Sequence, residues 1–143
     1  MDVKPFDPGP ENTHALAADG DGAAFSALAA LYYHHADAGV EPAVIALARA
    51  VEFGRLAAMK GGRREWIAFL YLLEEHSHAL RDVGLTGRAN SVQAEAFVLA
   101  EEIAEQGDEE LAEMVVTGAA EVDPAVLMIA REMRRAVEPV TEH

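Results

Sequence analysis

Cysteine is absent from the sequence, and aromatic residues make up only 6% of its 143 positions. Without cysteine the chain has no thiolate metal site, no cysteine nucleophile and no disulfide framework. A chain of this length buries roughly two thirds of the surface that its unfolded form exposes, so it needs no disulfide or metal to fold. We therefore expect one domain, and the lack of disulfides fits a cytoplasmic location.

Long apolar runs are missing as well, although 51% of the residues are hydrophobic. No stretch reaches the roughly 18 unbroken apolar residues that a membrane-spanning helix needs. Residues 1–8 have no apolar core region and little positive charge, so they do not predict a secretory signal. Much of the hydrophobic content is alanine, which favours helices and lets them approach closely.

Positive charge is scarce: 11 basic residues face 25 acidic ones, for a net charge of −14. A negative field of this size argues against nucleic acid or an anionic membrane as a partner. Ten of the acids lie between Ala89 and Ala130, a stretch without lysine or arginine. Such a run is typical either of a solvated helix face or of a docking surface for a basic partner. The acids are Glu95, Glu101, Glu102, Glu105, Asp108, Glu109, Glu110, Glu113, Glu121 and Asp123.

Features of catalysis are also missing. The sequence has no glycine-rich phosphate loop and no nucleophile paired with a base, so we expect neither an enzyme nor a bound cofactor. One alternative centres on Glu75 and His78, whose i, i+3 spacing on a helix is half of a carboxylate di-metal site. His78 and Leu80 also show a weak similarity to the histidine phosphotransfer signature, although Asp82 stands where that signature has glycine.

Helical periodicity, by contrast, runs through nearly the whole chain, and no alternation predicts a strand. Gly61-Gly62 predicts a left-handed stop to the second helix, and Gly84 and Gly87 are expected to end the third. Ser91 is the expected N-cap of the fourth helix, and Gly118 the expected end of the fifth. After a first helix that closes at a turn over residues 37–39, the predicted helices span about 42–60, 64–83, 92–106, 108–117 and 124–137.

Short turns between the helices predict antiparallel hairpins. We expect an extended N-terminal arm over residues 1–13, followed by a single domain over residues 14–143. The three hairpins are expected at about 16–62, 63–107 and 108–138.

One phrase occurs twice in the chain. Residues 39–49, GVEPAVIALAR, return at residues 121–131 as EVDPAVLMIAR, an offset of 82 residues or twice 41. A period near 40 is the size of a helical hairpin that stacks on copies of itself. The phrase therefore predicts equivalent second helices in the first and third hairpins.

The first hairpin resembles the Sel-one-like repeat, a relative of the tetratricopeptide repeat. The resemblance implies an all-α fold in which antiparallel hairpins stack as a short α–α superhelix of about six helices. It further implies that the first helix of each hairpin lines a concave face, and that the chain serves as an adaptor for proteins or peptides. The matching positions are Gly20, Ala24, Leu28, Ala29, Tyr32, Gly39, Val40, Ala50, Phe53, Ala57, Ala58 and Gly61.

Candidate partner-binding residues are aromatic and acidic side chains, since aromatic residues dominate binding hot spots and the acidic run suits a basic partner. Trp66 is open to a second interpretation as a core residue. The final helix has an apolar stripe that includes Val126, Ile129 and Met133, for which we expect cover from a second copy of the chain or from the N-terminal arm. The candidates are Tyr33, Trp66, Glu74, Glu109, Glu110 and Glu113.

Overall fold

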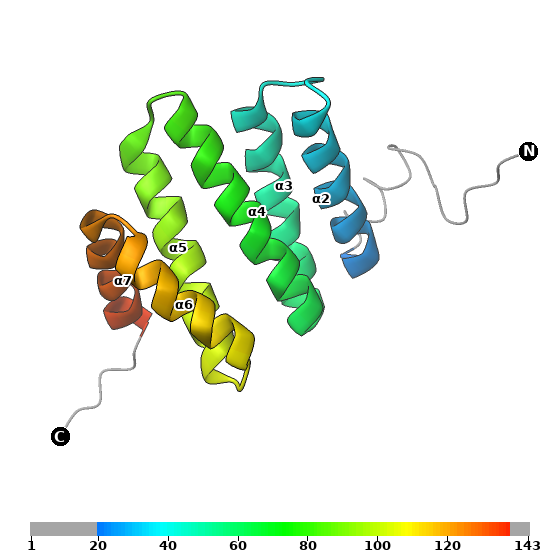
Figure 1. Ribbon diagram of the computed structural model, residues 1–143. Coiled ribbons are helices and arrows are strands. Elements are labelled where there is room, and N and C mark those ends of the chain that lie inside the picture. The colour runs from blue at the N-terminus through cyan, green and yellow to red at the C-terminus, as the bar shows by residue number, and fades with distance from the viewer. Residues whose placement is uncertain (1–19, 138–143) are drawn as a thin grey trace, which may run out of the picture. The chain divides into compact units, whose positions relative to one another are not determined.

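The computed structural model describes residues 20–137, and within this range the protein is all-α, with six helices and no strand (Figure 1). This confirms the predicted all-α class and the predicted number of helices. The N-terminal arm predicted over residues 1–13 lies outside the described residues. The helices are α2 (Gly22–Asp37), α3 (Ala43–Lys60), α4 (Arg63–Asp82), α5 (Thr86–Glu105), α6 (Glu109–Glu121) and α7 (Pro124–Val137).

The chain forms two compact units, which we call unit 1 (Met1–Leu72) and unit 2 (Leu73–His143). The boundary between them falls within α4. Unit 1 holds α2, α3 and the first half of α4. Unit 2 holds the second half of α4 together with α5, α6 and α7.

Unit 1 is built on an antiparallel hairpin of α2 and α3 (Figure 1). Its core joins Phe25 and Leu28 of α2 to Ala57 of α3, all buried. Beside this core the rings of Tyr32 and Phe53 stack with centroids 5.8 Å apart. Two of the small residues that carry the repeat resemblance, Ala24 and Ala57, therefore lie in the core between the two helices.

Local signals explain where α2 and α3 begin. The Asp21 side chain accepts a hydrogen bond from the Ala24 amide at 3.1 Å, which satisfies a free N–H of the first turn. Pro42 precedes α3, where the missing N–H of proline costs nothing. Glu41 then accepts a hydrogen bond from Arg49 at 3.1 Å. It also accepts one from the His35 ring at 3.1 Å when Nδ1 of His35 carries a proton. The turn is thus tied to both of the helices that it joins.

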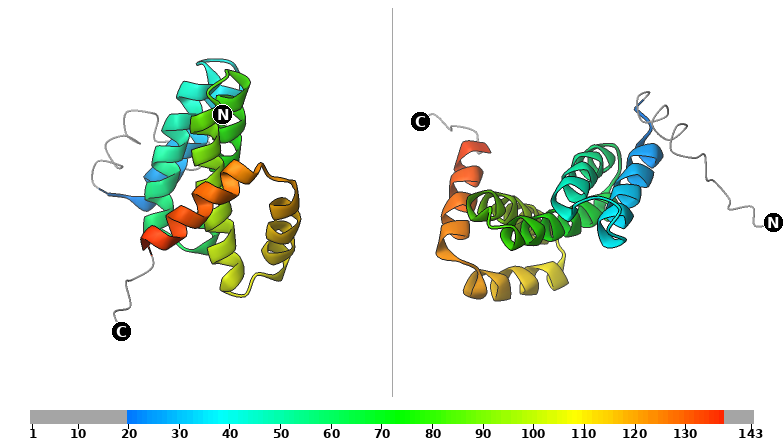
Figure 2. Two further views of the ribbon diagram at one scale, coloured as in Figure 1. Left: turned by 90° about the vertical axis from the view of Figure 1, so that its left-hand side faces the viewer. Right: turned by 90° about the horizontal axis from the view of Figure 1, so that it is seen from above.

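Unit 2 is organised around α5, which contacts both α6 and α7. Figure 2 shows these two helices on different sides of α5. Val126 and Ala130 of α7 are fully buried against Ala94 of α5, with Phe97 and Ile129 packed beside them. The apolar stripe of the final helix is therefore covered by α5 of the same chain, and the predicted homodimer is not needed to bury it.

The predicted start of the fourth helix was wrong. The helix α5 begins at Thr86, six residues before the predicted start at residue 92, and it runs through Gly87. Ser91 is inside this helix and is not its cap, because its hydroxyl donates to the Gly87 carbonyl one turn earlier at 3.2 Å. Gly84 alone ends α4, with a positive φ of 82° that favours glycine.

Two further glycines do not act as predicted. Gly61 is extended, with φ −104° and ψ −153°, so the predicted left-handed stop is wrong at this position. A Cβ at Gly61 would lie 2.6 Å from the Glu65 side chain, so a larger residue there would require the Glu65 side chain to move. Gly118 does not end α6, which continues to Glu121.

No helix among residues 20–137 combines the length and the apolar character that crossing a membrane requires.

Candidate functional site

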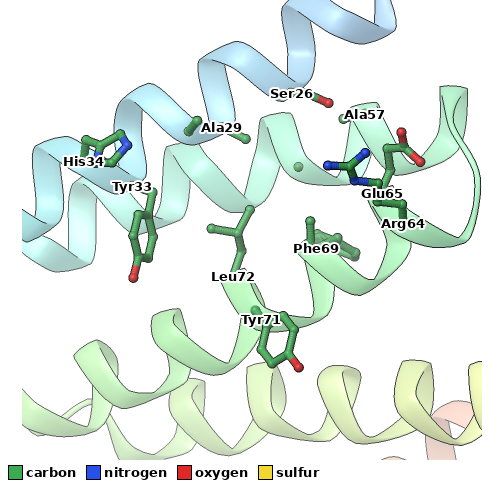
Figure 3. A pocket seen from close by; sticks show the side chains of 13 residues that line it. Ser26, Ala29, Tyr33, His34, Ala57, Arg64, Glu65, Phe69, Tyr71 and Leu72 are labelled. Carbon is green, nitrogen blue, oxygen red and sulfur yellow. The ribbon is translucent and has the colours of Figure 1, made fainter. Parts of the chain in front are cut away.

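A pocket of about 570 Å³ opens in unit 1 between α2 and the first half of α4 (Figure 3). Gly54 and Ala57 of α3 form its floor. We call this pocket the α2–α4 groove. From α2 it is lined by Ser26, Ala29, Ala30, Tyr33 and His34, and from α4 by Arg64, Glu65, Ala68, Phe69, Tyr71 and Leu72.

The floor of the groove depends on small residues. A Cβ at Gly54 would lie 2.6 Å from Cδ1 of Leu72 and 3.4 Å from Cδ1 of Phe69. Glycine at position 54 therefore lets these α4 side chains lie directly on α3. Ala57 next to it is buried and has no long side chain to fill the space above.

Phe69 forms the most firmly held part of the wall. Its side chain is only 2% exposed. The Arg55 guanidinium lies over its ring at 4.8 Å from the centroid, and Trp66 meets the ring edge-on at a centroid distance of 6.0 Å. Contacts on several sides keep this wall pre-formed, which lowers the entropy lost when a ligand binds.

Two ionic side chains lie at the end of the groove where α4 begins. Glu65 folds back on its own helix start, where its carboxylate accepts a hydrogen bond from the Gly62 amide at 2.9 Å. That hydrogen bond lowers the pKa of Glu65, with a smaller contribution from the nearby Arg64 charge. Figure 3 shows the Arg64 guanidinium pointing away from this carboxylate and over the groove.

The structure separates the predicted partner-binding residues. Tyr33 lines the α2–α4 groove, with 37% of its surface exposed. Trp66 is half-buried beside Phe69 and lies outside the lining. Glu74 belongs to unit 2. Of the six candidates, only Tyr33 is part of the groove.

The three remaining candidates lie together on one helix. Glu109, Glu110 and Glu113 are exposed on α6, which begins where Asp108 accepts a hydrogen bond from the Leu111 amide at 2.9 Å. Leu111 is the one buried residue of this helix within the described chain. The acidic face of α6 therefore faces solvent, as both interpretations of the acidic run require.

The alternative site on α4 is partly exposed and partly buried. Glu75 and His78 are exposed, and burial raises the pKa of Glu74 despite the nearby charge of His78. Sequence reasoning missed His76, which is 8% exposed with no hydrogen-bond partner for Nδ1 among the described residues. Ser77, also buried, donates to the Glu74 carbonyl at 2.7 Å. The sequence does not distinguish His76 from the exposed His78 two residues later, because only the register of α4 shows which of the two faces inward.

Among residues 20–137 no group of three or more histidine, aspartate and glutamate side chains is placed to hold a metal ion.

No protein-family model, no curated protein and no solved structure matches this chain.

Proposed function

We propose that this protein is a protein-interaction module that binds a segment of a partner protein in the α2–α4 groove. The observation that carries the proposal is the groove itself, a pocket of about 570 Å³ with a largely apolar lining and a few polar groups. Binding sites usually combine concave apolar walls with a small number of polar groups that fix orientation. The firmly packed wall at Phe69 supports the same conclusion.

The shape of the lining favours a chain segment over an enclosed small molecule. Several lining side chains are exposed, among them Ser26, Ala30, Ala68 and Tyr71. An open groove presents a line of contacts along two helices, which suits side chains that project from a peptide. The proposed role is binding without catalysis.

The wider setting is also a proposal. The resemblance to Sel-one-like repeats supports hairpins that stack into an α–α superhelix, with the first helix of each hairpin on the concave face. In unit 1 the groove is lined by α2 and α4, the helices that this interpretation assigns to the concave face. A cytoplasmic location accords with the lack of cysteine.

A second candidate function rests on the exposure of His78. A phosphotransfer histidine must be reached by its partner, and His78 meets this requirement while the buried His76 does not. Incubation with a small-molecule phosphoryl donor would label wild-type protein and spare a His78→Gln variant. Equal labelling of the two proteins would eliminate this candidate.

The groove can be tested with a random peptide library displayed on phage and panned against the full chain. Ala30 and Ala27 offer a matched pair, because both are exposed on α2 and only Ala30 lines the groove. We expect Ala30→Trp, which fills the groove, to abolish binding of the selected peptides, and Ala27→Trp to leave it unchanged. Selected peptides that bind both variants equally well would show that the groove is not the binding site.

A further inference from the structure

Charge is divided unequally between the two units. Residues 20–72 carry five acidic and five basic side chains, whereas residues 73–137 carry fourteen acidic and five basic ones. The described part of unit 1 is therefore neutral in a chain whose net charge is −14. Three of its bases, Lys60, Arg63 and Arg64, lie within five residues at the turn from α3 into α4.

Arg64 is the base of this turn that lines the α2–α4 groove. Its side chain is exposed, and its guanidinium has no hydrogen-bond partner within the part of the chain that the structure describes. The adjacent carboxylate of Glu65 is already occupied by the Gly62 amide at 2.9 Å. The groove thus presents an available cation at one end.

Apolar surface follows directly after this cation along α4. Phe69 and Leu72 project from the wall, and Ala29 faces them from α2 (Figure 3). The Tyr33 hydroxyl supplies a hydrogen-bonding group at the other end of the lining, beyond Leu72 (Figure 3). The lining therefore runs from a guanidinium to an apolar stretch and then to the phenol of Tyr33.

From this order we infer that the groove selects a partner segment in which an aspartate or glutamate precedes or follows a bulky apolar residue. The carboxylate pairs with Arg64, whose planar fork suits bidentate contacts to carboxylates. The apolar side chain packs between Leu72 of α4 and Ala29 and Ala30 of α2, which line the groove. This inference rests on the proposed function and adds the charge of the ligand to it.

The charge of the ligand is opposite to the one that the composition of the chain predicts. The acidic face of α6 repels acidic segments and attracts basic ones. The groove in unit 1 reverses this preference locally, because the interactions of a side chain in contact with its ligand outweigh a field that salt screens over about 8–10 Å.

Panning with the same phage library tests the inference, and synthetic peptides of the selected sequences give affinities by fluorescence anisotropy. We expect the selected sequences to be enriched in Asp or Glu beside Leu, Ile or Phe. Replacing that acid by its amide is expected to weaken binding to the full chain about tenfold, as for a charge-assisted pair that is lost.

Variants of the protein supply the matching test. Arg64→Glu is expected to weaken binding by more than about tenfold, because it replaces attraction by repulsion, and Arg64→Lys is expected to retain part of the affinity. Lys60→Glu is the control, since it makes the same change of net charge at an exposed side chain outside the lining. Equal losses from Arg64→Glu and Lys60→Glu would reduce the effect to general electrostatics and overturn the inference.

The outcomes separate the two proposals. If selected peptides lose binding to Ala30→Trp but show no enrichment in acids and no response to Arg64→Glu, the groove binds peptides and the inference is wrong. If peptides bind only after removal of residues 1–19, the occupant is the chain's own N-terminal segment. If the wild-type chain self-associates in sedimentation and Ala30→Trp does not, the occupant is a second copy, and either of these last two results also overturns the inference.

Discussion

The two copies of the repeated phrase become helices that begin alike and pack differently. Pro42 precedes α3 and Pro124 opens α7, as the shared acid-proline pair predicts. In α3 the buried residues of the phrase include Ala46, which is 0% exposed, yet its counterpart Met128 in α7 is 65% exposed. The reverse holds for Ala48 and Ala130.

The counterpart pair at positions 48 and 130 shows this directly. Ala48 is exposed in α3, whereas Ala130 is 0% exposed in α7 and packs in the core with Ala94 of α5. The arginines that end the two phrases differ as well: Arg49 pairs with Glu41 of its own copy, and Arg131 pairs with Glu101 of α5. A shared sequence therefore determines where these helices begin, while their neighbours determine which face is buried.

A charge placed at counterpart positions of the two copies tests most directly whether they differ in burial. Ala130→Asp buries an unpaired carboxylate and is expected to destabilise the protein by about 3 kcal/mol. Ala48→Asp, at the exposed counterpart, should cost no more than the roughly 0.7 kcal/mol of helix propensity. Urea denaturation followed by circular dichroism measures both variants.

A reciprocal pair controls for the nature of the substitution. Ala46→Asp is expected to cost about 3 kcal/mol and Met128→Asp less than about 1 kcal/mol, the opposite order along the chain. Similar losses at Ala46 and Met128 would mean that the two copies pack equivalently after all.

The next largest difference concerns Gly54, which follows the first copy, and Ala136, which lies 82 residues later at the same distance behind the second copy. Gly54→Val is expected to cost about 2 kcal/mol, because the added methyl groups meet Leu72 and Phe69. Ala136→Val, at an exposed site, should stay within roughly 0.7 kcal/mol. Urea midpoints give the comparison, and an unchanged midpoint for Gly54→Val would show that α4 does not press on this part of α3.

The stability of unit 2 is expected to depend on pH, because the buried His76 lies in this unit. Burial lowers the pKa of His76 below its ordinary value of 6.5, and the positive charge of Arg88 adds to this effect. The unfolded chain thus takes up the proton more readily, so this contribution to stability is present above pH 6.5 and is lost as the pH falls toward the folded pKa. Thermal melts between pH 7.5 and 5.5 are expected to show the loss.

His76→Leu should flatten this pH dependence, while His78→Leu, at an exposed site two residues on, should retain the wild-type slope. Glu74 acts in the opposite direction, because burial raises its pKa and protonation therefore favours the folded form. A wild-type slope in His76→Leu would assign the acid response to another group.

A smaller effect is expected from the ion pair that Arg134 of α7 makes just after the second copy. Arg134 donates to both carboxylate oxygens of Glu105, at 2.8 and 3.1 Å, and this pairing lowers the pKa of Glu105. Its stabilising effect is therefore lost as the pH falls below the ordinary carboxyl range. Arg134→Gln should lower the melting temperature slightly at low salt and not at high salt, since exposed pairs are screened. Arg49→Gln, which removes the exposed pair with Glu41 in the first copy, gives the comparison in unit 1.

The sequence allowed the fold class and most helix ends to be predicted, because capping groups and prolines act locally. Pro42 and Asp108 both mark predicted helix starts in the structure. The prediction that Ser91 caps a helix was wrong, because a serine hydroxyl inside a helix can donate to the carbonyl one turn earlier. Here Ser91 donates to the Gly87 carbonyl. Local chemistry alone does not distinguish these two uses of serine.

The candidate site was less predictable, because it depends on contacts between helices. Tyr33 was identified from its residue type, whereas Arg64 and Gly54 have no local pattern that marks them as lining residues. Their roles follow from the approach of α4 to α3, which brings Leu72 over Gly54. His76 was overlooked for the same reason.

Trp66, the single tryptophan of the chain, lies in unit 1 with its ring 6.0 Å from that of Phe69. Intrinsic tryptophan emission therefore reports on unit 1 alone, while far-ultraviolet ellipticity averages over the helices of both units. A difference between the two signals during denaturation would reveal that the units unfold in separate steps, without any label. Since Phe69 lines the α2–α4 groove, the same emission offers an optical signal for events there.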